Sequence, residues 1–251
     1  MTDILICGIS GRMGQNILSL LQGDSEARAV CGVDICIPGN SPVPVYATFG
    51  EVREHVDAVI DFSSPQSLCG ILEFCERTGA AAVLATTGYS AEDLQSIEAA
   101  AEKIAVFRTA NFSVGVNLLV KLVREAATFL GADYDIEIIE KHHHNKKDAP
   151  SGTALMLADS ANSAFEGEKE YVCGREGIVG KRGTEIGIHA VRGGSITGDH
   201  DVLFCGEDEV ITLSHHAGSR KIFANGAIRA AKFTAGKPAG KYCMDDVLAE
   251  L

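Results

Sequence analysis

Up to Asn111 the chain alternates short apolar runs with longer amphipathic segments, and this alternation limits the possible folds more than any other feature of the sequence. The apolar runs have the length of strands, and the segments between them repeat apolar residues at helical spacing, as at Ile17, Leu18 and Leu21. Strands are expected at 4–7, 29–33, 57–62, 81–85 and 104–108, and helices at 13–21, 65–78 and 91–103. Strands that alternate with helices in this way predict an α/β fold with a doubly wound parallel sheet.

The pattern changes after residue 111. One long helix is expected at 114–130, followed by a half-buried strand at 135–140, where apolar and polar residues alternate. From about 184 to 214 the chain is strand-like with short turns and no helix between the strands, which predicts an α+β domain with a mixed or antiparallel sheet. The expected domains are a dinucleotide-binding domain at 1–112 and a second domain at 113–224, with 225–251 packing back on the first.

The turn after the first expected strand is rich in glycine. Glycines at 8, 11 and 14 form G-x-x-G-x-x-G, a variant of the G-x-G-x-x-G spacing of dinucleotide-binding folds. Glycine lets the chain turn sharply and lets backbone N–H groups approach a pyrophosphate at a helix N-terminus. Asp34 ends the next strand, at the spacing beyond Gly14 where a carboxylate can hold the ribose hydroxyls of adenosine. A purely structural turn is the alternative, but the strand, turn, helix and acid together predict a nucleotide site.

Asp34 also bears on the choice of cofactor. A carboxylate repels the 2′-phosphate of NADPH, and Ile35 follows it where an arginine would pair with that phosphate. The sequence therefore favours NADH. NADPH stays a second possibility, because Arg12 would offset the charge of Asp34 if it reached the 2′-phosphate; the alternative is that Arg12 is a surface residue at the helix start. The turns at 86–88 and 111–113 also follow strands, so both are expected to line the nicotinamide half of the site, although such a turn, taken alone, is more often a helix cap.

Residues 141–147 are a basic segment in an acidic protein. They hold three lysines, three histidines and no acid, in a chain whose net charge is −12. Histidine gives or takes a proton near neutral pH, and lysine supplies a point charge, so His142, His143 and Lys146 are candidates for proton transfer and anion binding. Local charge of this kind can attract a small anion even when the protein as a whole is acidic.

A helix is expected to begin just after this segment, at Gly152, with Ser151 as its cap. The backbone N–H groups of Gly152 and Thr153 would suit a carboxylate there. A metal site is disfavoured, because neighbouring histidines on an extended chain point to opposite faces and no H-x-x-x-H helix or cysteine pair accompanies them. A solvated basic loop stays the plain alternative, which the preceding strand and the following helix start disfavour.

Composition excludes several other classes of protein. The excess of acidic over basic residues, 34 to 22, argues against a nucleic-acid or anionic-membrane surface. No apolar run approaches the roughly 18 residues of a membrane span, and no secretory leader is expected. None of the eight cysteines has C-x-x-C spacing, so they are expected to be reduced in a cytoplasmic protein. No tyrosine is followed four residues later by lysine, which excludes the tyrosine–lysine chemistry of short-chain dehydrogenases.

Residues 137–154 read EIIEKHHHNKKDAPSGTA and resemble the signature E-[IV]-x-E-x-H-x-x-x-K-x-D-x-P-S-G-T-A of the dihydrodipicolinate reductase family of the diaminopimelate route to lysine. The turn at 8–14 and the segments 111–117 and 223–229 also resemble that family. The resemblance implies a Rossmann-like domain joined by the C-terminal tail, and a central α+β domain that binds substrate and builds a homotetramer. It also implies reduction of 4-hydroxy-tetrahydrodipicolinate, a small dicarboxylate, to tetrahydrodipicolinate with NADH or NADPH.

The same resemblance implies roles for individual residues. His142 would give or take a proton, and Lys146 would donate a proton and contact substrate. His143, Gly152 and Thr153 would bind the substrate's carboxylates. Ala85 stands where the family has glycine; backbone contacts to the cofactor would survive that change, so it bears only on the detail of the cofactor fit. The dinucleotide would be held by Gly8, Ile9, Ser10, Gly11, Arg12, Met13, Asp34, Ala85, Thr86, Thr87, Thr109, Ala110, Asn111 and Phe112.

Two alternatives from other classes stay open at this point. One is another two-domain NAD(P)-dependent reductase that acts on a small carboxylate. The other is a non-enzymatic sensor of NAD(H) built on the same nucleotide-binding fold. A sensor has no need for clustered proton donors beside an anion-binding helix start, so the stretch 142–153 counts against it.

Overall fold

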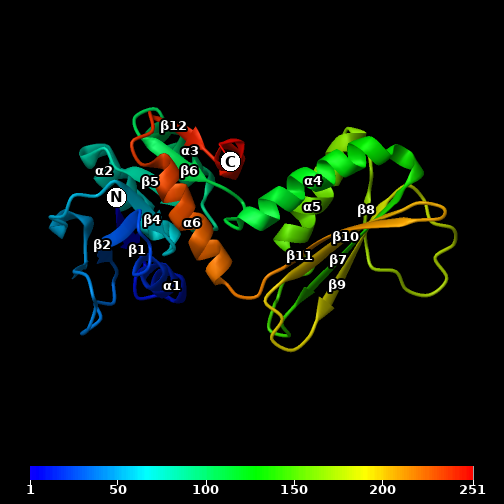
Figure 1. Cartoon of the computed structure of the whole chain (residues 1–251), viewed down its shortest axis with the longest axis horizontal. Coiled ribbons are helices and arrows are strands. Elements are labelled where there is room, and N and C mark those ends of the chain that lie inside the picture. Colours follow the sequence, from blue (N-terminus) through cyan, green and yellow to red (C-terminus); the bar gives the residue numbers. More distant parts are fainter. Residues whose placement is uncertain (251) are drawn as a thin grey trace. The chain divides into compact units, whose positions relative to one another are not determined.

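The computed structural model describes residues 1–250 and divides the chain into two units, each with its own sheet (Figure 1). Unit 1 consists of Met1–Val114 together with the chain from Lys221 onward, and unit 2 consists of Gly115–Arg220. The sheet of unit 1 is parallel and that of unit 2 is mixed. The predicted fold class, a Rossmann-like parallel sheet with a second α+β domain, is therefore confirmed.

The sheet of unit 1 has seven strands in the order β12-β6-β5-β4-β1-β2-β3. They are β1 (Thr2–Cys7), β2 (Ala27–Val33), β3 (Val45–Tyr46), β4 (Ala58–Asp61), β5 (Ala81–Leu84), β6 (Ala105–Arg108) and β12 (Gly240–Tyr242). Ile4, Leu5 and Ile6 of β1 are all fully buried, because helices cover both faces of the sheet. The chain runs outward from β1 in both directions, and such a switch point is where open α/β sheets bind ligands.

Two layers of helices cover this sheet. One layer holds α2 (Leu68–Thr78) and α3 (Ala91–Ala101), and the other holds α1 (Arg12–Leu21), α6 (Lys221–Thr234) and α7 (Met244–Ala249). Helix α6 lies close to the turn after β6, since a Cβ built at Gly226 would stand 1.6 Å from the carbonyl oxygen of Phe112. Helix α6 and that turn therefore pack at a distance that only glycine permits.

Unit 2 is a five-stranded sheet in the order β11-β10-β7-β9-β8. Its strands are β7 (Asp135–His142), β8 (Tyr171–Cys173), β9 (Ile186–Arg192), β10 (Asp199–Cys205) and β11 (Val210–His216). Strand β7 pairs antiparallel with β10 and parallel with β9, which makes the sheet mixed. Helices α4 (Val114–Leu130) and α5 (Gly152–Asn162) pack on one face, against Ile136, Ile138, Val202 and Phe204 (Figure 1).

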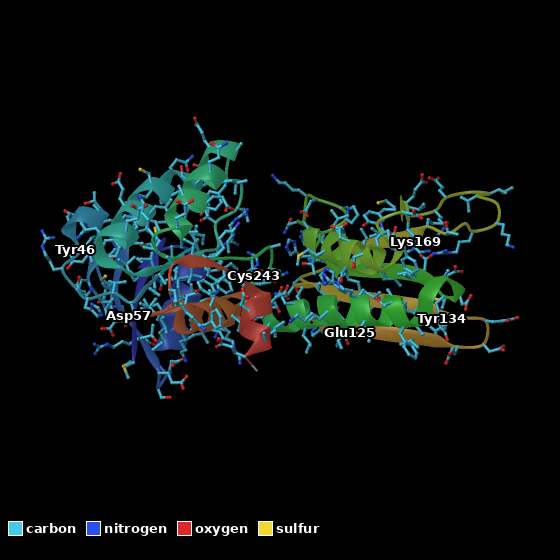
Figure 2. The ribbon with its side chains drawn as sticks, turned by 90° about the horizontal axis from the view of Figure 1, so that it is seen from above. Tyr46, Asp57, Glu125, Tyr134, Lys169 and Cys243 are labelled. Atoms are coloured by element: carbon cyan, nitrogen blue, oxygen red, sulfur yellow. The ribbon has the colours of Figure 1, made fainter. Side chains whose placement is uncertain are left out.

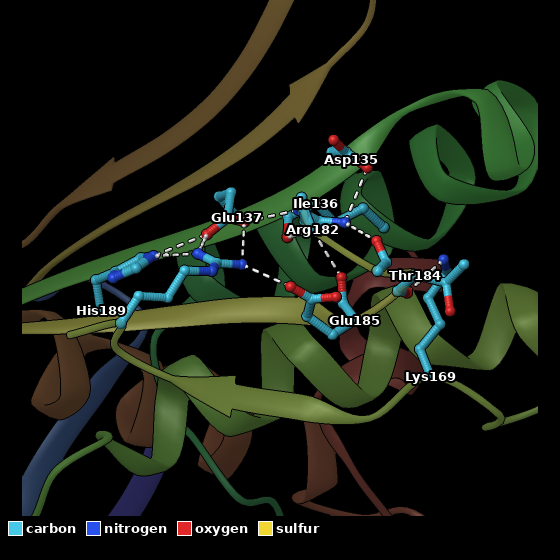
Figure 3. Close-up of polar contacts among 10 residues, drawn as sticks. Asp135, Ile136, Glu137, Lys169, Arg182, Thr184, Glu185 and His189 are labelled. Atoms are coloured by element: carbon cyan, nitrogen blue, oxygen red, sulfur yellow. Dashed lines mark hydrogen bonds and ion pairs between the residues drawn. The ribbon is translucent and has the colours of Figure 1, made fainter. Parts of the chain in front are cut away.

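The opposite face of β7 carries an ionic network around Glu137 (Figure 3). Its carboxylate accepts hydrogen bonds from Arg175 at 2.9 and 3.0 Å and from Arg182 at 3.1 Å, and it pairs with His189 at 2.7 Å. Burial acts to raise the pKa of Glu137, but these hydrogen bonds outweigh it and lower the pKa to about 2. Arg182 also donates to the carbonyl oxygens of residues 136 and 185, so the network fastens the loop after β8 to the sheet.

Charged and polar side chains are distributed over the surface of both units. Figure 2 shows Glu125 on the exposed side of α4 and Lys169 in the loop between α5 and β8. Among residues 1–250, none of the helices combines the length and the apolar character that crossing a membrane requires.

The structure also holds elements that the sequence patterns did not predict. Strands β3, β8 and β12 are two or three residues long, too short to show a period, and α7 was not expected. The helix expected from Pro65 begins with a 3-10 turn, Pro65–Ser67, and becomes α-helical at Leu68. Three further 3-10 turns lie at Phe49–Glu51, Gly131–Asp133 and Ser163–Phe165.

Candidate active site

Unit 1 contains a cavity of about 890 Å³ at the carboxyl ends of β1 and β2. Four residues predicted to bind cofactor line it: Gly8, Ser10, Gly11 and Asp34. Gly8 has a φ of +79°, and a Cβ there would lie 3.0 Å from the carbonyl oxygen of Phe62. A Cβ at position 14 would lie 2.3 Å from the carbonyl oxygen of Gly8. The turn therefore requires glycine, and it presents backbone rather than side chain to the cavity.

Asp34 is fixed at the wall of this cavity. Its Oδ2 accepts the backbone N–H of Ser10 at 2.9 Å, and its Oδ1 accepts the N–H of Cys36 at 3.0 Å. Each carboxylate oxygen has a second lone pair, so both stay able to accept a ribose hydroxyl. The cavity thus combines a glycine turn at a helix start with a carboxylate at the end of β2, which fits the adenosine and pyrophosphate of a dinucleotide.

Charge along the cavity wall is mixed. Among the described residues that line it, Arg77 is the single cation, and Asp34 and Glu73 are acids. The guanidinium of Arg77 lies over the ring of Phe74, 5.3 Å from its centroid. Arg12, the arginine that the sequence offered for a phosphate, is exposed at the first position of α1 and does not line the cavity.

Other predicted cofactor residues lie elsewhere along the same edge of the sheet. Ile9 is buried against Gly32, and Met13 is the second residue of α1. Thr109 and Ala110 line a separate cavity of about 380 Å³ near β6 and β12. Phe112 is buried between two other phenylalanine rings, with centroids 5.8 and 5.9 Å away. Asn111 precedes it in the turn after β6, where its Oδ1 accepts the N–H of residue 113.

The turn that holds Ala85, Thr86 and Thr87 follows β5 directly. Among residues 1–250, Glu166 is the single non-glycine residue with a positive φ, so Ala85 takes a backbone conformation that alanine adopts without strain. Its N–H donates to the carbonyl oxygen of Asp61 at 3.0 Å. The alanine in place of the expected glycine is therefore accommodated.

Asp61 is a buried acid that sequence patterns did not single out. Its carboxylate accepts the N–H and the hydroxyl of Ser63 at 3.0 and 2.5 Å, and the hydroxyl of Tyr89 at 3.2 Å. It thereby joins the loop after β4 to the loop after β5. Burial is the main reason that the pKa of Tyr89 rises, so that hydroxyl keeps its proton and stays a donor.

In unit 2, β7 ends at His142, on the sheet face that the helices cover. Its Nδ1 lies 2.6 Å from Oε2 of Glu140, which is fully buried. A carboxylate accepts hydrogen bonds, so Nδ1 carries the proton toward Glu140 and Nε2 is the nitrogen left for other chemistry. A Cβ at Gly198 would lie 2.9 Å from that Nε2, so glycine at 198 keeps this side of the ring clear.

Glu140 has two more partners. Arg192 donates to both carboxylate oxygens at 2.6 Å, and the backbone N–H of Ser151 donates to Oε1 at 3.0 Å. Burial acts to raise the pKa of Glu140, but the hydrogen bonds from Arg192 and His142 outweigh it and hold the pKa below its ordinary value. The carboxylate is therefore ionised, and it links β7 to the start of α5.

Ser151 caps α5 as expected. Its Oγ accepts the N–H of Ala154 at 3.1 Å and lies 2.9 Å from Nε2 of His200. Burial lowers the pKa of His200 to about 4, so this imidazole is neutral at pH 7 and accepts the Ser151 hydroxyl proton. Gly152 and Thr153 form the first turn of the helix, and a Cβ at Gly152 would meet no atom within 4 Å. The start of α5 is thus capped by Ser151, and the space beside Gly152 is open.

The basic segment runs from the end of β7 into the loop that follows it. Lys141 lies on the open face and pairs with Asp201 at 2.7 Å, whereas Lys146 pairs with Asp148 at 2.9 Å. The pKa of His143 is lowered by burial and by the nearby guanidinium of Arg220. The positive charge near His142 and His143 therefore comes partly from Arg220, a residue far along the chain that the sequence motif did not include.

Comparison with known proteins identifies one family. The family model described as dihydrodipicolinate reductase, N-terminus, matches residues 2–112, and the one described as dihydrodipicolinate reductase, C-terminus, matches residues 115–248. A 4-hydroxy-tetrahydrodipicolinate reductase of Caldanaerobacter subterraneus subsp. tengcongensis is 46% identical, over 99% of this chain and 98% of that protein. One of Clostridium tetani is 43% identical, over 99% of this chain and 97% of that protein.

A solved structure agrees with these relatives. The dipicolinate-bound dihydrodipicolinate reductase of Paenisporosarcina sp. TG-14 superimposes with a TM-score of 0.81 and 27% identity, covering 97% of both chains. The family models span nearly all of this chain, and both relatives align with it from end to end. The chain therefore belongs to the dihydrodipicolinate reductase family of NAD(P)H-dependent oxidoreductases.

Proposed function

We propose that the chain catalyses the reaction named by its relatives, the reduction of 4-hydroxy-tetrahydrodipicolinate, and that unit 2 binds this dicarboxylate. The proposal rests on one observation: the imidazole of His142, hydrogen-bonded to the carboxylate of Glu140, lies close to the start of α5, which Ser151 caps. A proton donor and an anion site stand together there, as the reduction of an anionic imine-type ring requires. A sensor of NAD(H) has no use for either.

The binding groups of unit 2 suit two carboxylates. The N–H groups of Gly152 and Thr153 at the helix start would bind one of them, aided by the helix dipole. His143 and Arg220 would bind the other, because the charge of Arg220 acts on His143, whose pKa is lowered by burial and by that charge. Lys146 adds a cation that would exchange Asp148 for substrate, since the Asp148 side chain is 61% exposed and water competes for this pair.

Proton transfer would use Nε2 of His142. Conversion of the 4-hydroxy substrate to tetrahydrodipicolinate also removes the 4-hydroxyl group as water, which leaves a conjugated imine-type ring. A nicotinamide cofactor supplies a hydride to that ring when bound, and the electron-rich ring that results must take up a proton. Glu140 holds the Nδ1–H of His142, so Nε2 faces away from the carboxylate. In the doubly protonated imidazolium, whose charge Glu140 balances, the Nε2–H is the proton that can be delivered. Lys146 is the second donor, in the loop that follows β7, and it would resupply or share that proton.

The cofactor proposed is NADH in preference to NADPH. Asp34 is fixed by Ser10 and Cys36 at the cavity wall, where its charge opposes a 2′-phosphate. Arg77 lines the same cavity and gives the phosphate one cation, so NADPH is expected to be used less well rather than refused. Copies of the chain are also proposed to form a homotetramer through the open face of the second sheet, in the cytoplasm.

A spectrophotometric assay tests this function. The product of a coupled dihydrodipicolinate synthase reaction is mixed with the enzyme, and absorbance at about 340 nm follows NADH or NADPH. Oxidation with that product, faster with NADH, and none with ordinary keto acids is expected. Oxidation with keto acids instead would favour another small-carboxylate reductase, and no oxidation with tight NADH binding would favour a sensor. Competitive inhibition by dipicolinate, weakened in His143→Ala, would place the dicarboxylate site in unit 2.

A further inference from the structure

We infer that Glu140 and Arg192 are positioning residues for this reaction. They act through His142, whose imidazole they hold in a fixed position relative to the start of α5. The inference rests on the proposed role of His142 as proton donor. Neither residue is required to touch substrate or cofactor. Their contribution is to keep the Nδ1–H of the imidazole on Glu140, so that the proton to be delivered stands on Nε2, and to fix the position of the ring.

Glu140 sits where three separate segments meet. It is fully buried, and its two oxygens receive the imidazole of His142, both ends of the Arg192 guanidinium and the N–H of Ser151. A buried carboxylate without such partners would be strongly disfavoured and would take up a proton. In its ionised form it accepts the Nδ1–H of His142, which leaves Nε2 to carry the second proton of the imidazolium.

Arg192 completes this arrangement from β9. The cross-strand register places it directly opposite His142, and its guanidinium binds Glu140 in the two-pronged geometry that arginine favours. It also donates to the carbonyl oxygen of Asp148 at 2.8 Å. Asp148 belongs to the loop that carries Lys146, so one guanidinium joins the imidazole-bearing strand to that loop.

These contacts link the two functions of the site. Ser151 gives its N–H to Glu140 and its hydroxyl oxygen to the first turn of α5. The helix start, the loop of Lys146 and the ring of His142 are therefore all fastened to one ion pair. The start of α5 also keeps the Ser151 cap, and Lys146 keeps its pair with Asp148, whereas Glu140 is the described partner of Nδ1 of His142. Loss of Glu140 is therefore expected to move the imidazole most, and a displacement of about 1 Å can lower a rate by about 100-fold.

The opposite face of β7 provides a matched control. Glu137 is also partnered by a histidine and by arginines, but it lies on the open face and no described contact joins it to His142. Glu137→Gln therefore removes a similar ionic network from the same strand. Its kcat is expected to stay within about twofold of wild type when measured under conditions where the protein is folded and its assembly is unchanged.

A double-mutant cycle tests the inference. The variants are Glu140→Gln, His142→Gln and the two combined, with kcat, KM and the Kd for dipicolinate measured for each. Glu140→Gln is expected to lower kcat at least tenfold, but by no more than the roughly 10²–10⁴-fold that a positioned acid contributes. It is expected to change the Kd for dipicolinate less than about threefold. Added to His142→Gln, it is expected to lower kcat less than about twofold further.

The outcomes separate the two claims. If His142→Gln turns over like wild type, the proposed proton donor and the inference both fall. If His142→Gln is impaired and Glu140→Gln lowers kcat equally in both backgrounds, the proton donor stands and the inference is overturned. Arg192→Lys serves if Glu140→Gln does not fold, because lysine keeps the charge and loses the two-pronged contact. It is expected to lower kcat in the wild-type background and not in His142→Gln, and equal losses in both would overturn the inference.

Discussion

The ionic network at Glu137 makes a prediction about stability that depends on pH. Glu137→Gln removes the carboxylate that holds Arg175, Arg182 and His189 (Figure 3). The side chain of Glu137 is 19% exposed, so solvent screens these contacts only in part. Because Arg182 also fastens the loop after β8, the loss is expected to appear in the unfolding of unit 2.

The magnitude follows from the pKa. Folding lowers the pKa of Glu137 from 4.5 to about 2. Each unit of difference between the folded and the unfolded pKa is worth about 1.4 kcal/mol, so the ionised group contributes about 3 kcal/mol to the free energy of unfolding at pH 7. The folded pKa lies below the unfolded one, so this contribution is fully present above about pH 4.5 and is lost as the pH falls toward 2. The contribution of Glu137 to stability should therefore be about 1 kcal/mol smaller at pH 4 than at pH 7, and about 2 kcal/mol smaller at pH 3.

Urea unfolding followed by far-UV circular dichroism measures this, since the chain has no tryptophan to report by fluorescence. Glu137→Gln is expected to be less stable than wild type by up to about 3 kcal/mol at pH 7, with a difference that narrows as the pH is lowered to 4 and then 3. Glu168→Gln, at an exposed position of the loop before β8, serves as a control that should not change the pH dependence. A difference that stays constant, or widens in acid, would refute the electrostatic reasoning.

Three further substitutions test the two sites. Gly14→Ala places a Cβ 2.3 Å from the carbonyl oxygen of Gly8, so NADH titrations should show binding weakened at least about tenfold, and unchanged binding would contradict the close packing. Asp34→Asn removes the charge that opposes a 2′-phosphate, so the ratio of kcat/KM for NADPH to that for NADH should rise about tenfold or more. Ser151→Ala removes the cap of α5, which should cost about 1 kcal/mol in urea unfolding and raise the Kd for dipicolinate.

Features local in sequence were predictable from it. The glycine turn and Asp34 stand at fixed distances along the chain, and each longer strand or helix shows its own apolar run or period. The same holds for Ser151, whose role as a cap needs only the residues of the first helical turn. Strands β3 and β12 need pairing partners from elsewhere in the sheet, and a run of two or three residues shows no period by itself.

The parts of the site that depend on distant segments were not predictable. Arg192 meets Glu140 because β9 pairs with β7 in one register, and a pairing of strands far apart in the chain leaves no mark in a motif. For the same reason the basic segment looked uniform in the sequence, although Lys141 points to the open face and is neutralised by Asp201. Alternation along β7 gives the face of each residue, but the partners across the sheet come only from the fold.

The central claim is that His142 delivers a proton to a dicarboxylate held by unit 2. The most direct measurement compares His142→Gln with wild type, using NADH and the product of a coupled synthase reaction. A fall in kcat of about 100-fold or more, with KM and NADH affinity within about threefold, is predicted, because the lost interaction belongs to the transition state. Equal turnover in the variant, or a loss confined to KM, would contradict it.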